Sequence, residues 1–501
     1  TMNSRSTARL ATPDLIDLSL QAAANQDVYG SVSQLARKHG VSRRVVRAIR
    51  DETVAIVAKS TTQPPCSTNV RVTHGHLTRC IVALYMVGRC SIWSIVDLLP
   101  VLFPGVKGGG FGTVQRLLVE AAVRAKGFNA VVDLSGVYAA GLDEMFSQGD
   151  PVLAGIDLDS NYIFLVEKHE RRTTQDWEAA LKAKKLQGLA MKVAVRDGGA
   201  AIAAGVASVY PDAEQRDDNL HAQMTVTKVL HKVENRAYSA MSRIEELKLA
   251  LEKAQGRENP RPLHIAKLKG ELAKATKRCD ALMTEHEELT RLWGRLRAAL
   301  ELVDIARGTL RQSDKMREEL EAVADALLGS RRRDTRKAGG YIKRRLIGLT
   351  NYADSVHAKL EPLREEFGGE AVATAMIVLQ LAKLLKAKKM NKVRREQLKQ
   401  LRDGLNRLTA TGHADDILAA VAAILFGRHR ASSAIESMNA ALRTHLTIRK
   451  RTTDGFLHLF QAYFNLRVRR WGRFKSTSAW GLLTGQPAGD WLTHLGYPPA
   501  H

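Results

Sequence analysis

Two aspartates follow apolar segments that have the character of buried β-strands. Residues 152–156 form an apolar run that ends at Asp157, and a second run, residues 191–195, leads through Arg196 to Asp197. A carboxylate at the end of a buried strand is costly in free energy unless it is paired or bound to a metal. Two such carboxylates, each at a strand terminus, therefore predict a shared site for a divalent cation.

A third acid, Glu436, lies late in the chain in the first turn of a predicted helix. One face of this helix is marked by Ile435, Met438, Leu442 and His445, and Glu436 lies beside that face. The segment ends on three basic residues, Arg449, Lys450 and Arg451. The alternative is that Glu436 is a surface acid that pairs with Arg443.

The chain carries a large excess of positive charge. It has 76 Lys and Arg against 52 Asp and Glu, which gives a formal net charge of +24. A field of this sign favours a polyanionic partner, in particular nucleic acid, over the alternative that the charge only confers solubility. No apolar run approaches the roughly 18 residues of a membrane span. The cysteines form no CxxC pair and the N-terminus has no signal-peptide core, so we expect a cytoplasmic protein.

Residues 1–60 have the pattern of a helix-turn-helix domain. We expect Ser33 to cap one helix, Gly40 to form the tight turn and Ser42 to cap a second helix. The inner face of this second helix would carry Val45, Val46 and Ile49, and the other side Arg43, Arg44, Arg47 and Arg50. These arginines are expected to contact DNA from a helix in the major groove. The alternative is an ordinary helical hairpin with a solvated basic face.

A second helical module is expected at residues 68–130, after a linker at residues 60–67. Three apolar helices are predicted in it, at residues 77–87, 91–102 and 111–125, with glycines between the last two. We interpret this module as a second DNA-binding element.

A long helical region, residues 226–430, contains a heptad pattern. Apolar residues follow 3-4 spacing at Leu230, Val233, Ala237, Ala240, Ile244, Leu247, Leu251 and Ala254, and the pattern resumes at Ile265. Residues 256–262 interrupt it with glycine and prolines. Two heptad arms joined by a short turn predict an antiparallel coiled-coil hairpin at residues 226–303.

A concentrated basic segment follows the hairpin. Its members are Arg331, Arg332, Arg333, Arg336, Lys337, Lys343, Arg344 and Arg345. Basic residues at helix ends can be solvated or stabilised by the helix dipole. A cluster of this density is better explained by contacts with phosphates.

The three acids and their order resemble the catalytic domain of RNase H-like DDE transposases, in particular those of bacterial insertion sequences. Asp157, in GIDLDS, corresponds to the first acid, in the first strand of that fold. Asp197, in VAVRDGG, corresponds to the second, at the end of the fourth strand, and Glu436, in SSAIESMNAALR, to the third. His221 belongs to a segment that resembles a (C/D)xxH signature, with Asp218 where Cys is common. The long interval before Glu436 resembles members with a helical insertion there.

The resemblance implies two-metal phosphoryl transfer. Three carboxylates can hold two Mg²⁺ or Mn²⁺ ions, with Asp157 bridging them and Asp197 and Glu436 each completing one site. His221 would aid catalysis or contact a scissile phosphate, and a structural histidine is the alternative. Asp159 is the rival for the first acid, but it falls in a turn, whereas Asp157 directly follows the apolar run.

The expected fold is an α/β catalytic core with an RNase H-like mixed sheet inside a mostly α-helical chain. The core would comprise residues 131–225 and 431–501, separated by the insertion at 226–430. The expected activity is cleavage at transposon ends and strand transfer into target DNA. A homodimer or higher oligomer would bring two terminal inverted repeats of double-stranded DNA together. The alternatives are a non-enzymatic DNA-binding regulator and a nuclease or resolvase on the same fold.

Overall fold

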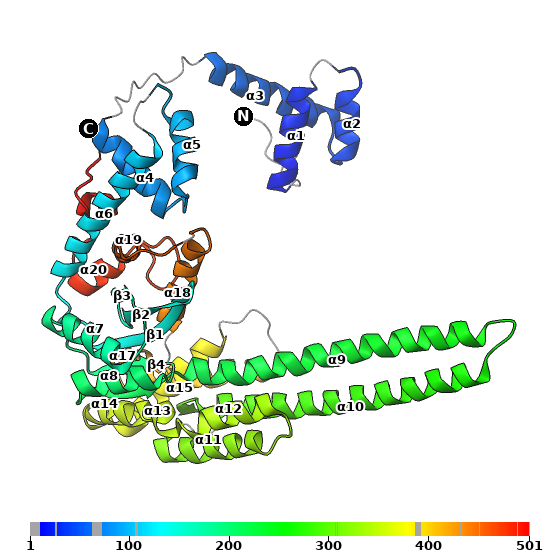
Figure 1. The fold of residues 1–501 in the computed structure, drawn as a ribbon, viewed down its shortest axis with the longest axis vertical. Helices are drawn as coiled ribbons and strands as arrows, with labels where there is room; N and C mark the ends of the chain where they lie inside the picture. The colour runs from blue at the N-terminus through cyan, green and yellow to red at the C-terminus, as the bar shows by residue number, and fades with distance from the viewer. Residues whose placement is uncertain are drawn as a thin grey trace. The chain divides into compact units, whose positions relative to one another are not determined.

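The computed structural model describes most of the chain as two compact units. The described residues are 11–25, 28–62, 73–105, 109–305, 307, 309–385, 392–430, 433–449, 451–487 and 489–499. The division falls between Val72 and Thr73. Figure 1 shows the helices and strands of both units.

The first unit contains three helices, α1 (Thr12–Ala24), α2 (Ser31–Lys38) and α3 (Arg43–Thr62). Its core is formed by Leu18, Ala22, Leu35, Ala36, Val46 and Ile49. Gly40, with a φ of +63°, lies in the turn between α2 and α3. The hydroxyl of Ser42 accepts a hydrogen bond from the Val45 amide at 3.3 Å, as expected of a cap. The cap expected at Ser33 is not found, because α2 begins two residues earlier, after Gly30.

A five-stranded mixed sheet lies at the centre of the second unit. Its strands are β1 (Ala139–Ser147), β2 (Asp150–Asp157), β3 (Ile163–Lys168), β4 (Val193–Arg196) and β5 (Glu214–Asp217), in the order β3-β2-β1-β4-β5. The first three strands are antiparallel, while β4 and β5 run parallel to β1. The prediction of an α/β core within a mostly helical chain is therefore confirmed. The apolar run that ends at Asp157 is the second strand and not the first.

The strand that precedes this run is joined to it by a tight hairpin. Gln148 and Gly149, with φ of 56° and 97°, connect β1 to β2. Two successive residues with positive φ are typical of a type I′ turn, whose twist matches that of the flanking strands. The hairpin places Asp143 of β1 opposite Ala154 of β2.

The two faces of the sheet are covered by different helices. On one face, α7 (Thr174–Leu186) and α8 (Ala200–Val209) share a core with Leu142, Leu153 and Phe164. On the other, α18 (Ser433–Leu446) contacts β1 and β2, and Ile435 lies beside Gly141. Helix α19 (Asp454–Leu466) runs along β3.

The predicted second helical module belongs to the same compact unit as the sheet. It consists of α4 (His74–Met86), α5 (Ile92–Leu102) and α6 (Phe111–Val131). Helix α6 packs along α19, and the Asn129 side chain donates a hydrogen bond to the His458 carbonyl at 3.0 Å. Residues 60–62 of the predicted linker continue α3, and its remainder lies outside the described residues.

The insertion begins with the predicted hairpin. Helices α9 (Asn219–Gln255) and α10 (Pro262–Ala299) pack along each other, and the break between them falls where residues 256–262 interrupt the heptads. Figure 1 shows the two helices as a long antiparallel pair. The first arm starts directly after β5, so it is longer than the predicted one. This geometry follows from the seam, since Val233, Ala240, Leu247 and Ala254 are buried at seven-residue intervals.

The rest of the chain adds two further helical clusters and the C-terminal segment. Near the base of the hairpin lie α11 (Ser313–Leu328), α12 (Arg333–Lys343) and α13 (Leu346–Thr350). The second cluster comprises β6 (Val303–Asp304), β7 (Thr309–Leu310), α14 (Tyr352–Phe367), α15 (Gly369–Leu385), α16 (Lys392–Thr409) and α17 (Ala414–Phe426). The described chain ends with α20 (Ala479–Thr484) and α21 (Trp491–His494). No single helix among the described residues has both the length and the apolar character needed to cross a membrane.

The distal part of the hairpin has a small apolar cluster of its own, which contains Leu247, Ala254 and Leu268. We predict that Leu247→Ala loosens this part alone, because removing a buried leucine side chain costs about 2–5 kcal/mol. Hydrogen exchange should accelerate in residues 244–275 and stay slow in the sheet. Leu249→Ala, at a position that is 56% exposed, is the control. Unchanged exchange in the tip, or equal acceleration in the sheet, would contradict the prediction.

Candidate active site

Two aspartates meet where the parallel strands β1 and β4 run side by side. The last paired residues of these strands are Leu142 and Arg196. The next residue on each strand is an aspartate, Asp143 on β1 and Asp197 after β4. Equivalent positions on adjacent parallel strands face the same side of a sheet at a spacing of about 5 Å. The two carboxylates are therefore neighbours.

Helix α18 brings a third carboxylate to this pair. The Asn439 side chain donates a hydrogen bond to Oδ2 of Asp143 at 2.6 Å and is 1% exposed. Glu436 lies three residues earlier, on the same side of the helix, and is half-buried. Positions three apart are neighbours on a helix surface. This hydrogen bond fixes the position of α18 and thereby places Glu436 near Asp143.

The three acids interact electrostatically. Burial raises the pKa of Asp143 from 3.8 to about 7, and the charges of Asp197 and then Glu436 act in the same direction. Hydrogen bonds from the Glu144 amide and from Asn439 oppose this rise. Crowded carboxylates of this kind disfavour their own ionisation, and a bound cation reverses that preference.

The donor set fits a hard divalent cation. Among the described residues, no group of three or more Asp, Glu, His or Cys side chains is already arranged to hold a metal ion. The three carboxylates nevertheless offer the oxygen donors that Mg²⁺ and Mn²⁺ prefer. Oδ1 of Asn439 adds a buried oxygen without a hydrogen-bond partner among the described residues. Asp143, Asp197 and Glu436 are the residues that would hold such ions.

The structure does not place Asp157 with Asp197 and Glu436. Asp157 pairs with Ala140 of β1, three positions from Asp143, so its side chain faces the opposite side of the sheet. Its Oδ2 accepts hydrogen bonds from the amide and hydroxyl of Ser160 at 2.8 and 2.5 Å and closes the β2–β3 turn. Burial raises the pKa of this 1% exposed carboxyl. The expected convergence therefore involves Asp143 instead. Asp159 pairs with His429 at 3.2 Å.

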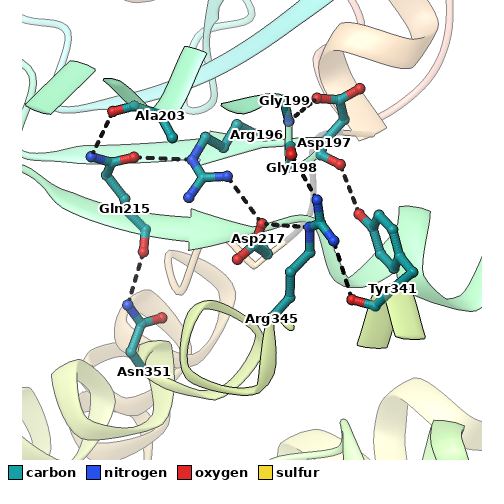
Figure 2. A network of polar contacts seen from close by, with 10 residues as sticks. All are labelled: Arg196, Asp197, Gly198, Gly199, Ala203, Gln215, Asp217, Tyr341, Arg345 and Asn351. Carbon is teal, nitrogen blue, oxygen red and sulfur yellow. Dashed lines mark hydrogen bonds and ion pairs between the residues drawn. The ribbon is translucent and has the colours of Figure 1, made fainter. Parts of the chain in front are cut away.

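The insertion holds the loop that carries Asp197 (Figure 2). The Tyr341 hydroxyl donates to the Asp197 carbonyl at 2.7 Å, and Nη2 of Arg345 donates to the Gly198 carbonyl at 2.7 Å. The Arg345 guanidinium lies 4.0 Å from the Tyr341 ring centre. It also pairs with Asp217 at 3.4 Å, which Arg196 contacts at 3.1 Å. Residues from α12 and its C-terminal end thus fix the backbone around the second acid.

His221 also lies at this junction. It is in the first turn of α9, and its ring centre is 5.5 Å from that of Tyr341. The preceding Asp218 caps α9 by accepting a hydrogen bond from the Leu220 amide at 2.7 Å. His221 is therefore near the Asp197 loop, while its predicted catalytic role stays a prediction.

Several predicted phosphate-binding residues are instead engaged within the protein. Arg332 forms two hydrogen bonds with Glu285, at 2.6 and 2.5 Å, and Lys343 pairs with Asp325 at 2.5 Å. Arg345 belongs to the network just described. Arg449 bonds to Tyr85 and stacks against the rings of Tyr85 and Phe456. These four side chains have structural partners, which an excess of basic charge in the sequence does not reveal.

Other predicted basic residues face solvent. Arg333, Arg336, Lys337 and Arg344 line a groove of about 760 Å³ together with Lys228 and Lys232 of α9. Arg331 and Arg451 are exposed as well, and Lys450 lies outside the described residues. In the first unit, Arg43, Arg44 and Arg47 are exposed on α3, while Arg50 pairs with Asp51 at 2.8 Å.

Comparison with models of known protein families gives no match, and a search of curated proteins finds none.

The raised pKa of Asp143 makes the stability of the metal-free protein depend on pH. Because the folded pKa is about 7 and the ordinary value is 3.8, folding favours the protonated form. This stabilisation is complete below about pH 4 and is lost as the pH rises through 7. We predict that Asp143→Asn raises the free energy of unfolding at pH 8, in EDTA, by on the order of 1–3 kcal/mol. Its effect at pH 5 should be smaller.

Denaturant unfolding at the two pH values measures this difference. Asp212→Asn, at an exposed position in the turn before β5, is the control. An Asp143→Asn effect that is the same at pH 5 and pH 8 would contradict the pKa shift.

Arg344 and Arg345 form a matched pair of adjacent arginines with different surroundings. Arg345→Ala should destabilise the protein by about 2–3 kcal/mol, because Asp217, only 5% exposed, loses one of its two cations. Arg344→Ala, at an exposed position, should cost less than about 0.5 kcal/mol. Equal stabilities of the two variants in denaturant unfolding would refute the structural role of Arg345.

Proposed function

We propose that this protein is a DDE transposase that cleaves DNA at the ends of a mobile element and joins them to target DNA. The observation that carries this proposal is that Asp197, at the end of β4, and Glu436, on a late helix, both act electrostatically on Asp143 of β1. The strand order β3-β2-β1-β4-β5 supports an RNase H-like core, since it puts the first and fourth strands side by side. In that arrangement Asp143, and not Asp157, occupies the position of the first acid.

Each acid has a definable part in this chemistry. Two Mg²⁺ or Mn²⁺ ions, when bound, supply an activated water or 3′-hydroxyl and stabilise the leaving oxygen during in-line phosphoryl transfer. Asp143 would hold these ions together with the other two acids, whose charges both act on it. Asp197 and Glu436 would each complete one site. Asn439 orients the Asp143 carboxylate through its hydrogen bond of 2.6 Å.

The basic surfaces supply candidate DNA contacts. The exposed arginines of α3 support a helix-turn-helix that reads the terminal inverted repeats. The groove between α9 and α12 carries six Lys and Arg side chains and one acid, Asp334, and would contact DNA phosphates. A homodimer would bring two element ends together, because strand transfer needs both.

Substitution of the acids tests the proposal. Asp143→Asn, Asp197→Asn and Glu436→Gln should each lower Mn²⁺-dependent cleavage by on the order of 100-fold or more, while DNA binding changes little. Asp157→Asn is the matched control, since that carboxylate is buried on the other face of the sheet. It should affect stability more than the rate. Cleavage and joining are scored on a supercoiled plasmid that carries the sequences flanking the coding region.

The outcomes separate the alternatives. Full activity of the three variants, or loss of cleavage only with Asp157→Asn, would refute the site. Cleavage without joined products would favour a nuclease or resolvase. Specific DNA binding with no metal-dependent cleavage by the wild-type protein would favour a regulator.

A further inference from the structure

A second site lies on another side of helix α18. A cleft of about 1010 Å³ is bounded by α18, α19, the β2–β3 turn, the residues before α18 and the segment after α19. We call it the basic cleft, after the seven arginines that line it: Arg89, Arg428, Arg430, Arg467, Arg469, Arg470 and Arg473. Among the described residues that line it, Asp490 is the one carboxylate, and it is paired with Arg79 at 2.6 Å. The basic cleft therefore has a strong positive charge.

This charge is only partly compensated by the protein. Burial, followed by the neighbouring charge of Arg430, lowers the pKa of Arg428 to about 10. Burial and the charge of Arg467 lower the pKa of Arg469 to about 10 as well. Nη1 of Arg469 is buried without a hydrogen-bond partner among the described residues. Cations held this close together are stabilised by an anionic ligand.

A closed loop displays an aromatic ring at the rim of the cleft. The Arg469 amide donates to the Thr477 carbonyl at 2.9 Å, and the Ser476 amide donates to the Arg469 carbonyl at 2.8 Å. The Arg469 guanidinium also donates to the Ser160 carbonyl at 3.2 Å, which attaches the loop to the β2–β3 turn. Trp471, between these closures, is 79% exposed. A large apolar ring held in water between arginines is an available stacking surface.

We infer that the basic cleft binds an unpaired segment of polynucleotide, with its phosphates at Arg467, Arg470 and Arg473 and a base stacked on Trp471. An unpaired segment is favoured over a duplex because the base faces of a duplex are already stacked on each other. The inference rests on the proposed function, since α18 connects the two sites. Ser433 and Ser437 of this helix line the cleft, while Glu436 and Asn439 face Asp143. A strand that leaves the three acids would thus enter the cleft.

Binding of short oligonucleotides tests the inference without cleavage. Full-length Asp143→Asn protein in EDTA is titrated into a fluorescent 10-nucleotide single-stranded DNA and into the same sequence as a duplex. Adding Trp471→Ala should weaken single-strand binding about 5- to 150-fold, the range of stacking on one aromatic ring. Trp471→Phe should retain most of the affinity, and duplex binding should be unchanged. Trp93→Ala, at a position on α5 that is 65% exposed, is the control.

The salt dependence of binding tests the contribution of the arginines. Replacing Arg470 and Arg473 by Gln should reduce the slope of log K against log salt by about 1.4, since each phosphate contact to a single strand contributes about 0.7. An RNA of the same sequence distinguishes the source of the strand, because its 2′-hydroxyls offer contacts that DNA lacks.

Unchanged single-strand affinity with Trp471→Ala, or an equal loss with Trp93→Ala, would overturn the inference. So would an equal loss of duplex binding, which would assign the cleft to double-stranded DNA. Because no metal or cleavage is involved, this result is independent of whether the three acids catalyse phosphoryl transfer.

Discussion

The burial of Asp143 beside two further carboxylates is the constraint on which the candidate site depends. Asp143 lies within a strand, where burial and the neighbouring acids raise its pKa to about 7. Such an arrangement is unfavourable in the metal-free protein, and its cost must be offset by the stability of the rest of the fold. The sheet supplies that stability, because β1 is paired on both sides and packs against helices on both faces. The charge is therefore held in place by rigid elements rather than by a loop.

The insertion contributes to the same site from outside the sheet. Tyr341 and Arg345 bond to the backbone of Asp197 and Gly198, and Gly198 has a φ of +93°. A side chain at Gly198 would collide with the Arg345 guanidinium, so the glycine is needed both for its backbone angle and for the close approach. Helices far from Asp197 in the sequence thus determine the position of this acid. A movement of the hairpin base relative to the sheet would shift the Asp197 loop through these contacts.

Much of the fold can be predicted from the sequence. The misplacement of Asp157 in the predicted site has a physical reason. The heptad seam of the hairpin, its break and the strand before Asp197 are visible because hydrophobic periodicity and glycine positions act locally. The sequence pattern does not identify Asp143, because the apolar run from Val152 predicts the first strand there. The apolar residues Ala139, Ala140 and Leu142 and the Gln148-Gly149 turn are the signals that could have identified β1. Asp157 has the stronger local pattern, yet strand pairing turns it toward the opposite face.

The partners of individual arginines could not be predicted. Arg344 and Arg345 are adjacent and chemically identical, but one faces a groove and the other a buried aspartate. That difference depends on which helix packs against the loop after β4. It is a property of tertiary structure and leaves no mark in composition or spacing.

Anomalous diffraction from crystals soaked in Mn²⁺ would locate bound metal at the candidate site. We expect anomalous density between the carboxylates of Asp143 and Asp197, within reach of Glu436, and its disappearance in crystals of Asp143→Asn. Density beside Asp157, or ordered Mn²⁺ elsewhere with none at Asp143, would contradict this expectation.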